Sequence, residues 1–108
     1  MDANVVVRMW RGAVRSEDRD AYVDYIEQTG MQEYRKTPGN IDAWMLTRDL
    51  PGSITEIVTV SRWQSLEAIK GFAGEDIQRA VFYSEDDRYL VERDTTVRHY
   101  SQLAAPSD

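Results

Sequence analysis

The sequence contains no cysteine and a single histidine, and each scarcity removes a class of functional site. Without cysteine the chain has no disulfide, no thiolate metal site and no cysteine nucleophile. His99 alone makes a zinc or non-heme iron site unconvincing, because such sites need several ligands placed together. We therefore expect a protein without a stoichiometric metal ion.

Long hydrophobic runs are also lacking. No apolar stretch approaches the roughly 18 residues of a membrane span, and no signal-peptide pattern is present, which predicts a soluble, cytoplasmic protein. Positive charge is scarce as well, with 13 lysines and arginines against 19 acidic residues and a net charge of −6. This balance disfavours binding to duplex nucleic acid and to anionic membrane surfaces.

What the sequence does contain is ordinary for one small globular domain. Its 108 residues suffice for one modest core, and 42% of them are hydrophobic and 30% charged. We expect a single domain over residues 1–103. The last five residues, Ala-Ala-Pro-Ser-Asp, are expected to form a disordered tail over 104–108.

Stretches rich in β-branched and aromatic residues predict four strands, at residues 5–10, 41–48, 54–62 and 95–103. Between the first two, a helix is expected to run from a cap at Ser16 to the turn that follows residue 36. Gly30 lowers the helix propensity within it and is expected at most to kink it.

A second helix is expected after the third strand. Ser65 is suited to cap it, because its side-chain oxygen can accept a bond from a free backbone N–H, and Gly74 is suited to end it. A further cap is predicted at Ser84, followed three residues later by Asp87.

The resulting order, β-α-β-β-α-β, is that of an α+β, ferredoxin-like protomer with an antiparallel sheet and helices on one face. The other face of such a sheet is commonly polar. Here both faces carry apolar residues: Val5, Val7 and Met9 point one way from the first strand, whereas Val6, Arg8 and Trp10 point the other. One helical layer covers one face only, so we expect the second face to pack on another copy of the chain, in a homodimer.

Four segments carry a resemblance to a known family: Trp63-Gln-Ser-Leu-Glu-Ala-Ile, Phe72-Ala-Gly-Glu-Asp, Tyr83-Ser-Glu-Asp-Asp and Val97-Arg-His-Tyr. With the predicted strand order, they make the chain resemble the antibiotic biosynthesis monooxygenases over nearly its whole length. It looks most like an uncharacterised bacterial branch with the Phe-Ala-Gly-Glu-Asp signature. The resemblance implies a dimeric α+β barrel. Members of the family include oxygenases of aromatic polyketides that use no metal or flavin, heme-degrading enzymes, quinol oxygenases and proteins without known chemistry.

The heme-degrading activity of that family is disfavoured here. Its heme-degrading members resemble one another in a first-strand asparagine, a strand-end tryptophan and a proximal histidine on the following helix. Trp63 matches the tryptophan, but Arg8 stands where the asparagine would lie and Asn4 comes too early. Residues 64–90 contain no histidine, so the proximal ligand is missing.

Two kinds of polar side chain are candidates for catalysis. His99 has an ordinary pKa suited to a proton acceptor near neutral pH, although a structural hydrogen bond within its strand is the favoured alternative. Arg8, Arg48 and Arg62 lie on predicted strands, where an arginine can hold a phenolate or a carboxylate. A salt bridge or an edge position is an equally weighted alternative for Arg8 and the favoured one for the other two.

Aromatic residues are numerous enough to line a flat pocket between the helices and the sheet. The candidate catalytic residues are Arg8, Trp63 and His99. The candidate substrate-binding residues are Trp10, Tyr22, Tyr25, Trp44 and Tyr83. The alternative is that these rings fill the core and the dimer interface, as large aromatic side chains commonly do.

Paired acidic residues at 75–76 and 86–87 are interpreted as helix-start residues that favour the helix dipole rather than as metal ligands. The leading hypothesis for function is a cofactor-independent monooxygenase that oxidises an electron-rich aromatic molecule, polyketide- or quinol-like. The rival hypothesis is a dimeric protein of the same fold that binds a small molecule without turnover or serves as an accessory protein. A third is an oxygenase or isomerase of an unrelated substrate.

Overall fold

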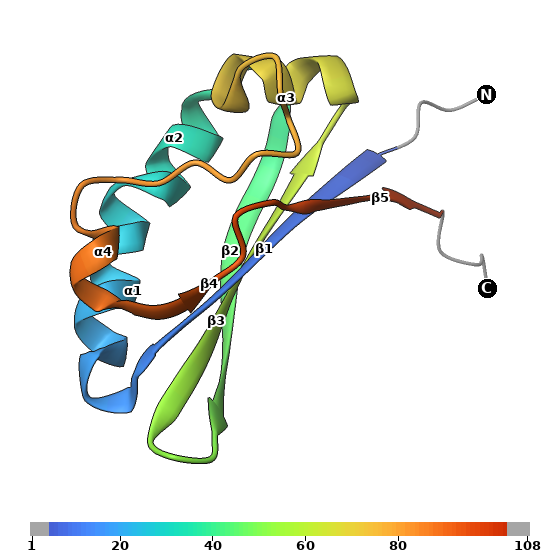
Figure 1. Cartoon of the computed structure of the whole chain (residues 1–108). Coiled ribbons are helices and arrows are strands. Elements are labelled where there is room, and N and C mark those ends of the chain that lie inside the picture. The colour runs from blue at the N-terminus through green and yellow to red at the C-terminus, as the bar shows by residue number, and fades with distance from the viewer. Residues whose placement is uncertain (1–4, 104–108) are drawn as a thin grey trace.

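A computed structural model describes residues 5–103, and the tail predicted at 104–108 lies outside the described residues. One antiparallel sheet carries the helices on one of its faces (Figure 1). The strands are β1 (Val5–Arg15), β2 (Asn40–Leu50), β3 (Ile54–Trp63), β4 (Leu90–Arg93) and β5 (Arg98–Gln102). The helices are η1 (Ser16–Asp18), α1 (Arg19–Gln28), α2 (Gly30–Lys36), α3 (Leu66–Ala73) and α4 (Asp86–Tyr89). The predicted α+β, ferredoxin-like fold is confirmed.

Strand β1 is the centre of the sheet, whose order is β2-β3-β1-β4 with β5 also paired to β1. β3 follows one edge of β1 from Val6 to Arg15, and β5 and then β4 occupy the other edge. The last predicted strand, at 95–103, is therefore shorter than expected and is preceded by β4, which was not predicted. β4 has only four residues, and its exposed Val91 and Glu92 give no alternating pattern to detect.

The single helix predicted between the first two strands is in fact two helices that meet at Thr29. This residue has φ −114° and ψ −84°, and its hydroxyl donates to the carbonyl of Tyr25 at 2.8 Å. The side chain thus competes for a carbonyl of the preceding turn, and Gly30, which follows, adds backbone freedom. The break turns α2 so that Met31 and Tyr34 are buried against the sheet.

Of the helix ends predicted after the third strand, those of α3 are confirmed and the start of α4 is not. The Ser65 hydroxyl accepts a hydrogen bond from the Ala68 N–H at 3.0 Å, and Gly74 ends α3 with φ 84°. The cap predicted at Ser84 is wrong, because Glu85 is the N-cap of α4 and makes no side-chain capping bond. Asp86 instead bonds the backbone of the residue three positions before it, at Tyr83.

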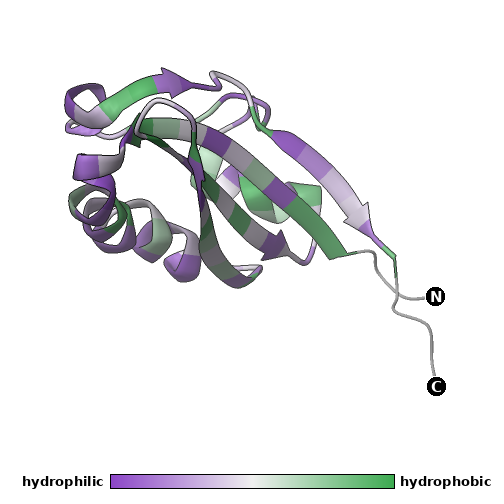
Figure 2. Cartoon of the chain, turned by 90° about the horizontal axis from the view of Figure 1, so that it is seen from below, coloured by the Kyte–Doolittle hydropathy of each residue, from purple (hydrophilic) through white to green (hydrophobic). Residues whose placement is uncertain are grey.

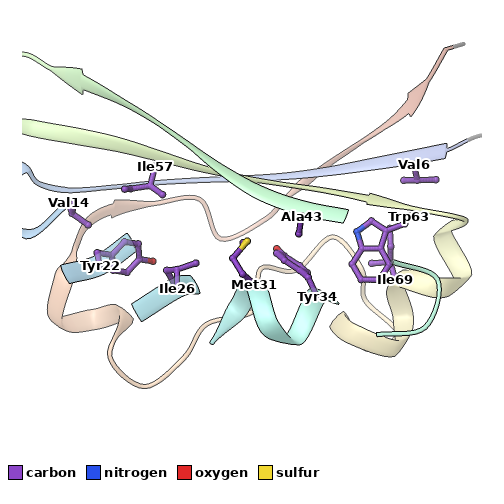
Figure 3. Close-up of a cluster of buried hydrophobic side chains, with 10 residues drawn as sticks. All are labelled: Val6, Val14, Tyr22, Ile26, Met31, Tyr34, Ala43, Ile57, Trp63 and Ile69. Carbon is purple, nitrogen blue, oxygen red and sulfur yellow. The ribbon is translucent and has the colours of Figure 1, made fainter. Parts of the chain in front are cut away.

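The two faces of the sheet differ in how deeply their side chains are buried, and the residues divide between the faces as the alternation along β1 predicts. Val6, Arg8 and Trp10 are buried on the helix side of β1, whereas Val7 and Met9 lie on the opposite face and are only half-buried. Figure 2 shows hydrophobic and hydrophilic residues following one another along the strands. Figure 3 shows the main core between helices and sheet, with Tyr22 and Trp63 toward opposite ends of it.

No helix within residues 5–103 has the length and apolar character needed to cross a membrane.

Candidate functional site

A narrow cavity of about 30 Å³ lies between the sheet and the helical layer. The wall is mostly apolar and aromatic, and charged groups enter it from β1 and α4. The lining residues are Arg8, Trp10, Tyr22, Ile26, Gly30, Met31, Tyr34, Thr59, Phe72, Val81, Phe82, Tyr83, Asp86 and Val97.

Arg8 brings a positive charge into this wall and is 1% exposed. Its Nη1 donates to the carbonyl of Ile77 at 2.5 Å and its Nη2 to that of Arg79 at 3.3 Å. Both acceptors belong to the irregular segment between α3 and α4, which crosses over the helix side of β1. Carbonyl dipoles thus hold the guanidinium in place without neutralising it.

No carboxylate within residues 5–103 forms an ion pair with Arg8, and its buried Nε–H has no acceptor there. Burial lowers the pKa of Arg8, and the nearby Tyr34 hydroxyl partly opposes that effect. The guanidinium carbon lies 5.7 Å from the centroid of the Phe72 ring, which contributes a weak attraction to the cation. The salt bridge that was the alternative explanation for Arg8 is therefore absent from the described part of the chain.

His99 lies directly opposite Arg8 in the β1–β5 pairing, and its Nε2 is 3.0 Å from Arg8 Nη1. Arginine can only donate, so Nε2 must be the acceptor and the ring proton sits on Nδ1. The pKa of His99 is lowered, first by burial and then by the charge of Arg8. In this arrangement Nε2 is occupied, so His99 positions Arg8 and is not free at that nitrogen to accept a substrate proton.

A second polar group of the wall is centred on Asp86, which is 2% exposed. Its Oδ1 accepts from the Tyr22 hydroxyl at 2.9 Å, and its Oδ2 accepts from the Tyr83 N–H at 2.6 Å. Burial, and then the charge of Asp86, raises the pKa of Tyr22 well above its usual range, so Tyr22 stays protonated and donates. Burial also raises the pKa of Tyr83 to about 12.

Trp63 is fully buried but does not line the cavity. Its indole N–H donates to the Ser61 hydroxyl at 2.8 Å, and its ring packs against Tyr34 and Phe72 at centroid distances of 6.0 and 6.3 Å. Trp63, a candidate catalytic residue, is therefore not part of the cavity wall. Trp63 supports two residues that do form it.

The predicted substrate-binding residues divide into two groups. Trp10, Tyr22 and Tyr83 line the cavity, and their role in substrate binding stays a prediction. The Tyr25 hydroxyl instead accepts from the Glu85 N–H at 3.0 Å and holds the start of α4. Trp44 lies on the opposite face of the sheet and is 40% exposed, so its assignment to the same pocket is wrong.

Arg48 and Arg62 are not at the site either. Arg48 pairs with Glu56 at 2.6 Å and Arg62 with Asp42 at 2.7 Å. The favoured alternative for these two arginines, an ion pair with an acidic side chain, is therefore correct.

Several wall residues were not recognised in the sequence. Asp86 stood in an acidic pair that favoured a helix start, and no local signal distinguishes a buried carboxylate from an exposed one. Tyr34 and Phe72 are at apolar positions of helices, which no local signal distinguishes from ordinary core positions. Their ring centroids lie 4.4 Å apart, beside Arg8. Within residues 5–103 no three histidine, cysteine, aspartate or glutamate side chains come together to hold a metal ion.

Solved structures of other proteins share this architecture over nearly their whole length. A Bacillus cereus protein provisionally named an antibiotic biosynthesis monooxygenase is 20% identical, with a TM-score of 0.65 over 97% of this chain and 99% of its own. A dimeric ferredoxin-like protein from an uncultured marine organism is 10% identical, with a TM-score of 0.62 over 95% and 99%. A mutant of SnoaB, a cofactor-independent oxygenase from Streptomyces nogalater, is 15% identical, with a TM-score of 0.57 over 97% of each chain.

This chain has their fold. The predicted architecture, derived from strand order and alternation, is thus found in proteins that carry the name of the family that the sequence resembles. No protein-family model matches the chain, and neither does any curated protein. The likeness establishes the fold, and the chemistry has to be argued from the side chains of the cavity.

Proposed function

We propose that this protein is a cofactor-independent monooxygenase that oxidises an electron-rich aromatic molecule in the cavity between helices and sheet. The observation that carries the proposal is the environment of Arg8. A buried cation on an apolar, aromatic wall, with an Nε–H that has no acceptor within residues 5–103, is suited to a substrate oxygen that gains negative charge.

The chemistry that fits such a wall begins with a ring ketone or phenol that loses a proton. The resulting enolate or phenolate gives an electron to O₂, and the two radicals combine to a peroxide anion, which takes up the released proton to form a hydroperoxide. Loss of water from that hydroperoxide leaves a carbonyl, so a methylene group and O₂ become a ketone and water. The protein has to supply a dry aromatic pocket, a proton acceptor and a cation that stabilises the anion.

The comparison with SnoaB supports the same reaction class, because a cofactor-independent oxygenase has been built on this fold. The Phe-Ala-Gly-Glu-Asp signature supports assignment to the branch that the sequence resembles. Phe72, its first residue, lines the cavity beside Arg8, and Gly74, its third, ends α3. In this proposal the signature places the aromatic surface on which a flat substrate would lie.

One observation favours the rival function, binding without turnover. The cavity of about 30 Å³ is far smaller than the several hundred Å³ typical of ligand pockets. A fused-ring substrate can enter only if the half-buried wall residues Phe72, Phe82 and Tyr83 move aside. A protein that binds a smaller aromatic anion, without O₂ chemistry, needs less movement.

We further propose that the protein is a homodimer in which the helix-free face of the sheet is the interface. The apolar residues of this outer face are Val5, Val7, Met9, Trp44, Leu46, Val58, Val60 and Tyr100. The same face also carries the ion pairs that Glu56 forms with Arg11 and Arg48 and that Asp42 forms with Arg62. Trp44, Leu46 and Tyr100 are 40 to 51% exposed, which is unusual for large apolar side chains gathered on one surface. The neighbour described as a dimeric ferredoxin-like protein supports this assembly.

The test of the oxygenase function is oxygen uptake with anthrones and hydroxynaphthoquinols, combined with product analysis. We expect the wild type to oxidise at least one of them. Arg8→Met should lower the rate by about 100-fold or more, the usual loss when a donor to an oxyanion is removed. Arg8→Lys keeps the charge but loses the Nε–H, so it should give an intermediate rate.

Arg19→Met is the matched control, because Arg19 is exposed on α1 and its one ion pair within residues 5–103 is with its neighbour Asp20. It should retain the wild-type rate. Tight anaerobic binding without oxygen uptake across the panel would support the rival function instead. An Arg8→Met variant that folds and turns over as fast as wild type would show that the proposed site is wrong.

A further inference from the structure

The cavity wall contains a buried carboxylate as well as a buried cation, and neither is paired with an ion of opposite charge within the described part of the chain. Within residues 5–103 no arginine, lysine or histidine forms an ion pair with Asp86, just as no carboxylate pairs with Arg8. Asp86 enters the wall from α4, and Arg8 enters it from β1. A buried unpaired charge is costly, and two of opposite sign in one cavity wall call for an explanation.

We propose that Asp86 is the proton acceptor of this site and that Arg8 receives the negative charge that the proton leaves behind. The substrate class is then a neutral ring ketone or phenol, with an acidic hydrogen at one edge and a conjugated oxygen at another. This inference rests on the proposed function, which it deepens by naming the base.

The bond changes of this step balance within the site. The C–H or O–H bond of the substrate breaks, and its proton moves to a carboxylate oxygen of Asp86. The electron pair stays on the substrate and spreads through the ring to the oxygen that accepts the Arg8 Nε–H. No other reactant is needed before O₂ arrives.

The hydrogen bonds around Asp86 leave its carboxylate able to accept a proton from the substrate. Each of its oxygens receives one hydrogen bond, from the Tyr22 hydroxyl or from the Tyr83 N–H, and an ionised carboxylate has lone pairs for about four. These two bonds fix its orientation, and Figure 3 shows Tyr22 between α1 and the sheet, with its hydroxyl toward the interior of the core. The other candidate base, His99, already uses Nε2 to accept from Arg8.

A purely structural role for Asp86 would be to fasten α4 to α1. The Asp86→Asn variant distinguishes this structural role from a role as base. Its amide keeps a carbonyl oxygen for the Tyr83 N–H and offers an N–H to the Tyr22 oxygen. This substitution keeps a hydrogen bond to each partner, with the direction reversed at Tyr22, and removes the charge and the basicity of the carboxylate. Asp87→Asn is the matched control, since Asp87 is the adjacent exposed carboxylate, paired with Arg93 on the surface.

The experiment measures proton abstraction apart from oxidation. Anthrone is incubated with the protein in deuterated buffer without oxygen, and the exchange of its methylene hydrogens is followed by NMR. We expect wild type and Asp87→Asn to accelerate exchange equally, and Asp86→Asn to lose about 100-fold or more of the acceleration. Asp86→Ala should lose it too and regain part of it with added formate, which can occupy the vacated space. Tyr22→Phe keeps the base and should retain exchange within about tenfold.

The outcomes distinguish the two proposals. Asp86-dependent exchange without oxygen uptake would contradict the oxygenase function but support the base. Oxygen uptake with exchange that is the same in folded Asp86→Asn as in wild type would overturn the base and leave the oxygenase function intact. A wild type that shows neither exchange nor uptake with the panel would overturn both.

Discussion

The guanidinium of Arg8 and the imidazole of His99 face each other across the β1–β5 pairing, with Nη1 3.0 Å from Nε2. A cation beside a neutral histidine is stable only while the histidine stays neutral. The pair therefore couples the protonation of one residue on β5 to the position of the charged group in the cavity wall.

The stability of the protein should fall with decreasing pH because of this pair. The pKa of His99 is lowered in the folded state by burial and by Arg8, so the unfolded chain binds the extra proton first. The contribution of His99 to the free energy of unfolding is thus fully present above about pH 6.5, the ordinary histidine pKa. It decreases below that pH until the pKa of the folded state is reached. One proton gives at most about 1.4 kcal/mol per pH unit, and the half-buried ring should show less because solvent screens the charge.

Chemical denaturation of wild type and His99→Gln between pH 5 and about 8 checks this expectation. Glutamine can still accept from Arg8 through its side-chain oxygen but does not titrate. The two proteins should differ in the slope of unfolding free energy against pH below about 6.5 and run parallel above it. Equal slopes throughout would contradict the assigned protonation state.

Gly30→Ala should stabilise the protein while it weakens ligand binding. Gly30 begins α2 and lines the cavity, and an added methyl group would lie 3.6 Å from the Tyr83 ring, an ordinary contact. Alanine gains up to about 1 kcal/mol over glycine in a helix, and less at its first position. The methyl group also takes space from a small cavity, so affinity for an aromatic ligand should fall about tenfold or more.

Thermal unfolding and ligand titration of Gly30→Ala test both parts. Gln32→Ala is the control, because it changes an exposed position of the same helix without reaching the cavity. Unchanged affinity in a stabilised Gly30→Ala would show that ligands bind elsewhere.

Light scattering at micromolar concentration should give a mass of twice 12.5 kDa. Trp44→Glu should give a monomer, because it places a charge in the middle of the outer face without touching the helix-side core. Leu66→Glu is a fair comparison, since Leu66 is 50% exposed but lies on α3, away from that face. It should remain dimeric, and a Trp44→Glu dimer would contradict the proposed interface.

Ser65→Ala should destabilise the protein by about 1 kcal/mol, the usual cost of losing an N-cap hydrogen bond. Ser84→Ala should change stability little, because the exposed Ser84 side chain makes no hydrogen bond within residues 5–103. Denaturation midpoints at one fixed protein concentration measure both, since dimerisation would make stability depend on concentration. Equal effects of the two substitutions would contradict the assignment of the cap.

The sequence by itself determined the features that depend on local periodicity. Alternation along residues 5–10 is enough to place Arg8 and Trp10 on one face and Val7 and Met9 on the other, because successive strand side chains point to opposite sides. The cap at Ser65 and the stop at Gly74 follow equally from local rules of helix ends. Element order then allows few sheet arrangements, and the ferredoxin-like one is found.

Only the tertiary structure decided which charges are paired. Arg62 and Arg8 both stand on strands, yet Arg62 meets Asp42 across the β2–β3 pairing, whereas Arg8 meets two carbonyls and a neutral histidine. Asp86 and Tyr22 are 64 positions apart in the chain, and no local sequence pattern predicts their hydrogen bond. Such contacts depend on how the segment between α3 and α4 folds back over β1, which is set by packing across the whole domain rather than by the residues next to each group.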